Sequence, residues 1–159
     1  MSQALTPLPV PEGFGEPAHV IRRGVLRLLH GCGFAAVVEL SLGSGRRADL
    51  AALGPSGEIW IVEIKSSIAD YRADRKWHEY RMHCDRLLFA VAPEFPIECL
   101  PADAGLIVAD AYGGELVYPG ALHRLPAATR KAMLIRFARV AAGRLAMQSD
   151  PSLGDPDLR

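Results

Sequence analysis

One acid and one base interrupt an otherwise apolar segment in the first half of the chain. Residues 59–65 read IWIVEIK, so Glu63 and Lys65 stand two positions apart among large hydrophobic side chains. Residues two apart on a β-strand point to the same face of the sheet. Burying an uncompensated charge is costly, so both groups need partners. They can pair with each other, or a divalent cation can be held there together with a second acid.

Asp49, in the preceding segment 47–53, is the candidate second acid. Two carboxylates favour Mg²⁺ or Mn²⁺, and Mg²⁺ usually keeps waters and completes its shell with substrate phosphate oxygens. A bound cation makes water more acidic, so that it can attack phosphorus. Lys65 would hold or help deprotonate this water, or neutralise charge in the transition state. These residues indicate phosphodiester hydrolysis; Glu39 is either a third acid or a surface residue.

The register between the two segments decides whether the two acids meet. A loop of residues 54–57 would place Asp49 opposite Val62, on the other face of the sheet from Glu63. Convergence requires an odd number of loop residues or a β-bulge, and the two glycines of this loop supply the necessary backbone freedom. We predict such an irregularity in this hairpin.

The elements that must position these residues follow from hydrophobic periodicity and turn residues. Three strands joined by tight turns form an antiparallel meander, and a polar helix then crosses over, so that the fourth strand lies parallel to the third. The third strand is apolar on both faces, which is typical of a central strand. The predicted elements are a helix from Glu16 to 31, strands over 34–42, 47–53 and 58–65, a helix over 67–84, strands over 85–92 and 105–110, a hairpin arm over 114–120 and a helix over 127–147.

This order predicts an α/β fold with a mixed central sheet flanked by helices. We expect an extended N-terminal arm over residues 1–15, a single domain over 16–147 and a polar C-terminal tail over 148–159. The net charge is zero, so any contact with nucleic acid needs a local basic patch. Three cysteines without a CxxC spacing indicate a reducing compartment, and the absence of a signal or membrane-length apolar run predicts the cytoplasm.

Basic, polar and aromatic residues near the predicted site are candidates for contact with DNA. Basic side chains can bind phosphates, and an aromatic ring can stack on an exposed base. Each also has an ordinary alternative: turn or solvated surface for the basic residues, core for the tryptophan and helix capping for the serine. The candidates are Arg46, Arg47, Ser67, Arg75, Lys76 and Trp77.

The Asp, tight turn and Glu-x-Lys within this order of elements resemble the PD-(D/E)xK nuclease superfamily. The segments GRRADLAALGPSGEIWIVEIKSS and DYRADRKWHEYRMHCDRLLFAVAP further resemble the bacterial MmcB-like DNA-repair family of that superfamily, and the resemblance covers roughly residues 16–145. It implies a restriction-endonuclease-like core with a helix, a three-stranded meander, a helix and a strand. It also implies Asp49 and Glu63 as metal carboxylates, Lys65 as the catalytic lysine, and DNA as partner. Ala48 stands where the superfamily's name has Pro.

We therefore expect a DNA-repair protein that hydrolyses phosphodiester bonds in DNA with Mg²⁺ or Mn²⁺. One alternative is a non-catalytic DNA-binding repair accessory. Another is a protein-interaction module with no nucleic-acid role, in which Glu63 and Lys65 form a structural ion pair. A small nuclease often needs two copies to cut both strands, which makes a homodimer a candidate assembly.

Overall fold

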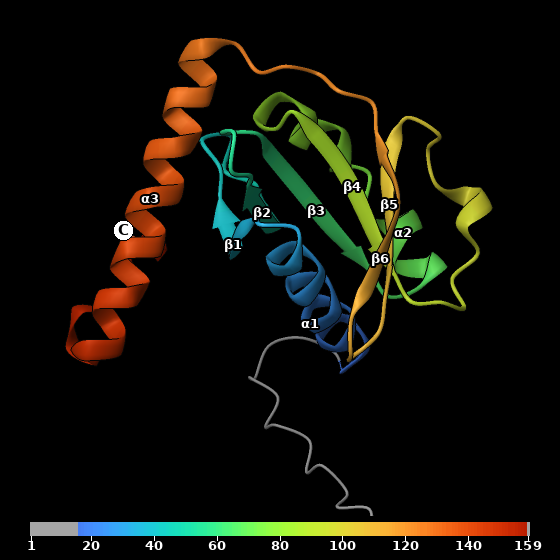
Figure 1. Cartoon of the computed structure of the whole chain (residues 1–159), viewed down its shortest axis with the longest axis horizontal. Coiled ribbons are helices and arrows are strands. Elements are labelled where there is room, and N and C mark those ends of the chain that lie inside the picture. Colours follow the sequence, from blue (N-terminus) through green and yellow to red (C-terminus); the bar gives the residue numbers. More distant parts are fainter. Residues whose placement is uncertain (1–15, 159) are drawn as a thin grey trace, which may run out of the picture.

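The structure is a computed structural model that describes residues 16–158, in which one six-stranded sheet runs in chain order (Figure 1). The first three strands are antiparallel, β3, β4 and β5 are parallel, and β6 is antiparallel to β5. This confirms the mixed sheet and the parallel fourth strand. The strands are β1 (Ala35–Ser41), β2 (Arg47–Leu53), β3 (Ile59–Lys65), β4 (Arg86–Val91), β5 (Ala104–Ala109) and β6 (Gly114–Gly120).

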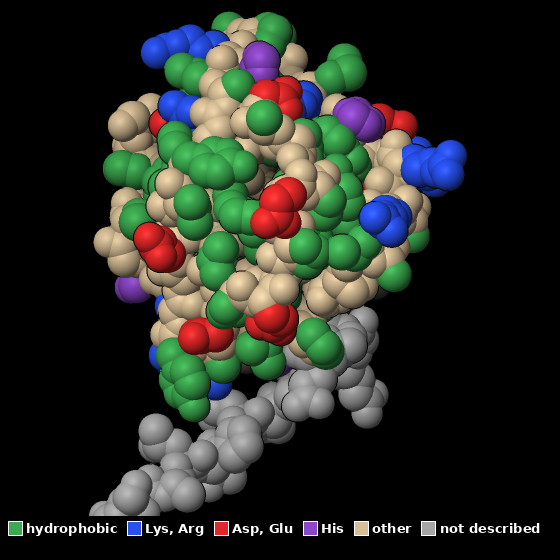
Figure 2. Space-filling view, turned by 90° about the vertical axis from the view of Figure 1, so that its right-hand side faces the viewer, with side chains coloured by type: hydrophobic (Ala, Val, Ile, Leu, Met, Phe, Trp, Pro, Cys, Tyr) green, Lys and Arg blue, Asp and Glu red, His purple; other side chains and the backbone are tan. Residues whose placement is uncertain are grey.

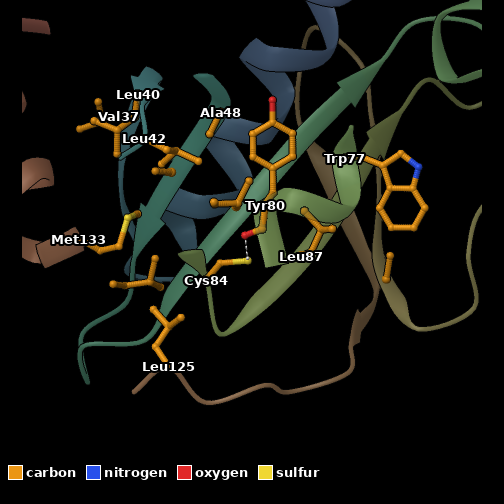
Figure 3. Close-up of a cluster of buried hydrophobic side chains, with 14 of the residues drawn as sticks. Val37, Leu40, Leu42, Ala48, Trp77, Tyr80, Cys84, Leu87, Leu125 and Met133 are labelled. Carbon is orange, nitrogen blue, oxygen red and sulfur yellow. Dashed lines mark hydrogen bonds between the residues drawn. The ribbon is translucent and has the colours of Figure 1, made fainter. Parts of the chain in front are cut away.

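The central strand β3 is buried along its whole length, because helical elements cover both faces of the sheet. Helix α1 (Glu16–Gly31) packs on the face that carries Trp60, Val62 and Ile64. The other face lies under η1, a 3-10 segment (Trp77–His83), and α3 (Ala127–Ser149). Figure 3 shows the hydrophobic cluster on this second face, which includes Met133 of α3 and Tyr80 of η1. Both predicted apolar faces of β3 are confirmed.

The predicted helix over 67–84 is wrong in its extent. Helix α2 (Ile68–Ala73) ends at Asp74, whose backbone is extended (φ −86°, ψ 101°), and the 3-10 segment η1 follows. The Asp74 carboxylate accepts a hydrogen bond from the Lys76 N–H and another from Lys65 Nζ. Such local bonds compete with a helical backbone. The 3-10 geometry then aligns Trp77 and Tyr80, three residues apart, so that both are buried.

The free edge of β1 is covered by the last part of α3 and by the residues that follow this helix. The guanidinium of Arg144 donates hydrogen bonds to the carbonyls of Val38 and Glu39. The Ser41 N–H donates to the Asp157 carboxylate over 2.9 Å. Two short 3-10 turns, η3 (Pro151–Leu153) and η4 (Pro156–Leu158), form this return path. They lie within the predicted polar tail, whereas the predicted N-terminal arm, residues 1–15, falls outside the described residues.

The opposite edge strand, β6, leaves hydrophobic side chains exposed. Figure 2 views the molecule from the side on which β5 and β6 lie, and green side chains gather there among scattered acids. Val117 and Tyr118 are exposed by 47% and 36%. Pro119 within the strand has no N–H to donate, so an added strand could not form a complete ladder with β6.

Replacing Gly24 by Ala is expected to destabilise the fold by about 1–2 kcal/mol, even though Ala favours a helix. A Cβ at Gly24 would collide with the carbonyl oxygens of Asp110 and Gly113, in the turn between β5 and β6. Urea denaturation measures the change. Gly31→Ala is the matched control in the same helix, because a Cβ there meets no atom within 4 Å. Equal stability of the two variants would contradict this packing of α1.

Candidate active site

The hairpin between β2 and β3 has a loop with an odd number of residues. Leu53 pairs with Ile59, so the loop contains five residues, 54 to 58. The Gly54 N–H donates to the Glu58 carbonyl over 2.8 Å, and Gly57 has φ 88°, a conformation that favours glycine. The predicted irregularity is confirmed in its first form, an odd loop.

This register brings Asp49 opposite Glu63 on the same face of the sheet. The last paired residues of the ladder are Leu50 and Val62, so the next position joins the two acids. At this position the backbone N–H groups donate to side-chain carboxylates instead of to the carbonyls of the neighbouring strand. The Asp49 N–H donates to Glu63 Oε1 over 3.1 Å, and the Ile64 N–H donates to Asp49 Oδ2 over 2.8 Å.

The two acids lie in an environment that opposes their ionisation. Burial raises the pKa of Glu63 to about 9, with a further contribution from the negative charge of Asp49. Burial also raises the pKa of Asp49, although the hydrogen bond from the Ile64 N–H acts in the opposite direction. Positive charge near these carboxylates would favour their ionised forms. The pair therefore has the electrostatic character of a cation site.

Lys65 has a partner that the sequence analysis did not identify. Its Nζ lies 2.6 Å from Asp74 Oδ2, and the lysine is 4% exposed. Burial would raise the pKa of Asp74, but the hydrogen bonds from Lys65 and the Lys76 N–H hold this pKa below its ordinary value. The ion pair between Glu63 and Lys65, on which one alternative depended, is not what the structure shows. Lys65 instead pairs with the residue that ends α2.

These side chains line a cavity of about 580 Å³ at the carboxyl end of β3. Three cationic residues and four acidic ones meet there. Tyr80 also lines the cavity, and its hydroxyl donates to the Arg47 carbonyl over 3.0 Å. Tyr80 was not among the predicted site residues. The charged lining residues are Arg46, Lys65, Lys76, Asp49, Glu63, Asp70 and Asp74.

Of the six predicted DNA contacts, two lie at this cavity. Arg46 lines it and forms an ion pair with Glu79 over 2.7 Å. Lys76 lines it as an exposed residue. Both acids that neutralise the cavity's bases, Asp74 and Glu79, come from the segment between β3 and β4. This segment therefore controls how much positive charge the cavity presents.

The other four candidates lie elsewhere or have structural roles. Arg47 and Arg75 are exposed but do not line the cavity. Ser67 caps α2, because its Oγ accepts a hydrogen bond from the Asp70 N–H over 3.0 Å. Trp77 is 8% exposed and packs edge-on against Phe89, with ring centroids 5.4 Å apart. Its ring therefore belongs to the core rather than to a base-stacking surface.

The residues present fit a cation that keeps part of its own solvent shell. Among residues 16–158, no group of three or more His, Cys, Asp and Glu side chains is arranged to hold a metal ion. Glu39 stands next to Asp49 in register, but its backbone has φ 50° and its carboxylate pairs with Arg47 over 3.2 Å. Two carboxylates with waters and phosphate oxygens are the usual surroundings of Mg²⁺. Asp49 and Glu63 match that donor set.

Comparisons with known proteins agree with this architecture. A family model described as "DNA repair protein MmcB-like" matches residues 9–152. The solved structure of SPO1766, a protein of unknown function from Silicibacter pomeroyi, is 46% identical with a TM-score of 0.83, and the match covers 86% of this chain and 94% of that chain. No curated protein matches. None of the described helices is long and apolar enough to cross a membrane. The extent of the family match shows that the chain belongs to the MmcB-like family of DNA repair proteins.

Proposed function

We propose that this protein is a Mg²⁺-dependent deoxyribonuclease with a restriction-endonuclease-like core of the PD-(D/E)xK superfamily. The observation that carries the proposal is the register between β2 and β3, which sets Asp49 opposite Glu63 and two residues from Lys65. The family's name supports a role in DNA repair and an interaction with DNA. Mn²⁺ would serve as a second metal, because it prefers the same oxygen ligands.

The roles of the residues follow from their positions. Asp49 and Glu63 would hold the cation through their carboxylate oxygens. When bound, the cation supplies positive charge at the scissile phosphate and makes a water molecule more acidic. Lys65 stabilises negative charge that develops on the phosphate, and Asp74 orients its ammonium group. Arg46 and Lys76 attract the backbone of DNA to the cavity.

A non-catalytic DNA-binding accessory is the second candidate. It is favoured by the hydrogen bonds that each carboxylate accepts from the other acid's strand, because these give both acids a structural role without a metal. In this case the cavity would bind DNA phosphates through Arg46 and Lys76. The nuclease and the accessory would both bind DNA, but only the nuclease would cleave it.

The deciding experiment incubates the purified protein with branched, damaged and single-stranded DNA in the presence of Mg²⁺ or Mn²⁺. We expect cleavage of at least one substrate, and Lys65→Ala should lower its rate by about 10²–10³-fold. DNA affinity, measured in parallel by fluorescence anisotropy, should change much less. Undiminished cleavage by the variant would refute the assignment of Lys65. Salt-dependent binding without any cleavage would support the accessory, and absence of binding would support an interaction module.

A further inference from the structure

A second concave surface lies along α3, on the other side of the β1–β2 turn from the active-site cavity. This groove has a volume of about 1190 Å³. Its floor includes Ile135 and Leu153, whose exposed fractions are 50% and 46%, whereas Met133 and Val140 are buried beside them. Gly43 in the β1–β2 turn and His83 at the end of η1 line the groove together with α3. Met133 is visible in Figure 3, where it points from α3 toward the sheet.

The shape of the groove suits an elongated occupant. Its lining runs from Ala128 to Ala146 along α3, which is eighteen residues of rise, or about 27 Å. Most of this wall consists of small side chains, so another backbone can approach closely. The far end is closed by the return of the chain, where a Cβ at Gly143 would collide with Pro156.

All charged side chains of α3 are positive. Its 23 residues include Arg and Lys but no Asp or Glu, in a chain whose net charge is zero. Arg130 pairs with Asp85, and Arg144 lies within ion-pair distance of two acids of the following turns. Arg136 and Arg139 line the groove instead, and no described acid forms an ion pair with either. Two cationic side chains thus stand beside an apolar floor without a negative partner.

We propose that this groove binds an acidic amphipathic helix of a partner protein. Apolar side chains of that helix would cover the exposed Ile135 and Leu153, and its carboxylates would face Arg136 and Arg139. An apolar floor rewards burial of apolar side chains, as in other helix-in-groove interactions. Nucleic-acid interfaces are polar and strongly charged, so the floor favours a peptide over DNA. This inference does not depend on the nuclease chemistry.

The test selects peptides from a display library against the full chain. We expect enriched peptides to carry net negative charge and apolar residues at spacings of three and four, the pattern of an amphipathic helix. The double variant Arg136→Glu/Arg139→Glu should bind a synthetic copy of such a peptide about tenfold more weakly or worse, as measured by fluorescence anisotropy. Lys131→Glu is the matched control, because Lys131 is an exposed cation of α3 that does not line the groove. Its affinity should equal that of the wild type.

Several outcomes would overturn the proposal. Enriched peptides without net negative charge, no enrichment, or equal affinity for the double variant would show that the groove does not select acidic helices. Self-association that the double variant abolishes, seen by analytical ultracentrifugation, would make the groove an interface between copies of this chain. Loss of DNA binding in the double variant but not in Lys131→Glu would make it a nucleic-acid surface. Thermal melting of each variant shows that a lost interaction is not a lost fold.

Discussion

Replacing Glu63 by Gln is expected to lower Mg²⁺-dependent DNA cleavage by about 10³-fold, while the metal-free protein becomes no less stable than the wild type. The substitution removes one of the two carboxylates that would hold the cation. It also removes the repulsion from Asp49 that, after burial, helps to raise the pKa of Glu63. Activity therefore falls without a loss of stability, which a simple loss of folding could not produce. Cleavage rates and thermal melting in EDTA measure the two effects.

Metal binding provides a readout for the same variant that is independent of cleavage. Mn²⁺ at about a hundred times its dissociation constant should stabilise the wild type by about 2.7 kcal/mol, and EDTA should reverse the effect. The Glu63→Gln variant should show little of this stabilisation. Glu115→Gln is the matched control, since Glu115 is exposed on β6 at the far edge of the sheet. A Mn²⁺ response in Glu63→Gln as large as that of Glu115→Gln would disprove the proposed cation site.

The second large effect is expected at Asp85, whose replacement by Asn should destabilise the fold by about 3 kcal/mol and lower Tm by about 10 °C. The Asp85 side chain is 3% exposed and accepts hydrogen bonds from the Ile59 and Leu125 N–H groups. The Arg130 guanidinium donates two further bonds, of 2.8 and 2.6 Å. One carboxylate thus connects β3, the segment before α3 and α3 itself. An amide in its place would turn one acceptor into a donor that faces other donors.

The ion pair between Asp103 and Arg81 is the matched control for this prediction. It has a similar length, 2.8 Å, but the Asp103 side chain is 60% exposed. Asp103→Asn should therefore cost less than about 1 kcal/mol, as surface ion pairs usually do. Urea denaturation of both variants at neutral pH makes the comparison. Similar losses of stability in the two variants would mean that burial does not strengthen the interactions of Asp85.

The stability that Asp85 and its hydrogen-bond partners contribute should also depend on pH. Burial would raise the pKa of Asp85, but the hydrogen bonds from Arg130 and from the Ile59 and Leu125 N–H groups outweigh it and lower this pKa. The folded-state pKa then lies below that of the unfolded chain. The stability from this group is fully present above pH about 4 and is lost as the pH falls through the folded-state pKa. The difference in stability between wild type and Asp85→Asn should stay constant near neutrality and shrink in acid.

Much of the sheet could be predicted because the patterns that define a strand are local. The predicted strand over 47–53 coincides with β2, and the predicted third strand differs from β3 by one residue. Apolar residues on both faces of β3 identified it as central. The long final helix was also predicted within two residues at its end. These assignments depend only on periodicity and on turn residues, which a single sequence displays directly.

The crossover between β3 and β4 shows the limit of such local patterns. Residues 67–84 have a polar composition that favours a helix, yet Asp74 breaks it. The reason is the buried ammonium group of Lys65, which lies in another element and binds the Asp74 carboxylate. A sequence shows that an acid and a base exist, but not which of several acids a strand end will meet. Asp74 was therefore missed as a site residue, and Trp77 turned into the core.

The sequence by itself determined the candidate residues, Asp49, Glu63 and Lys65, and the segments that carry them, because residue type and hydrophobic period are local properties. Only the tertiary structure decided that the hairpin loop has five residues, 54 to 58, and so sets the two acids face to face. It also decided that Lys65 pairs with Asp74 and that α3 stands beside an apolar groove. Register and ion pairing are settled by competition among groups from separate elements, and that competition takes place only in the folded chain.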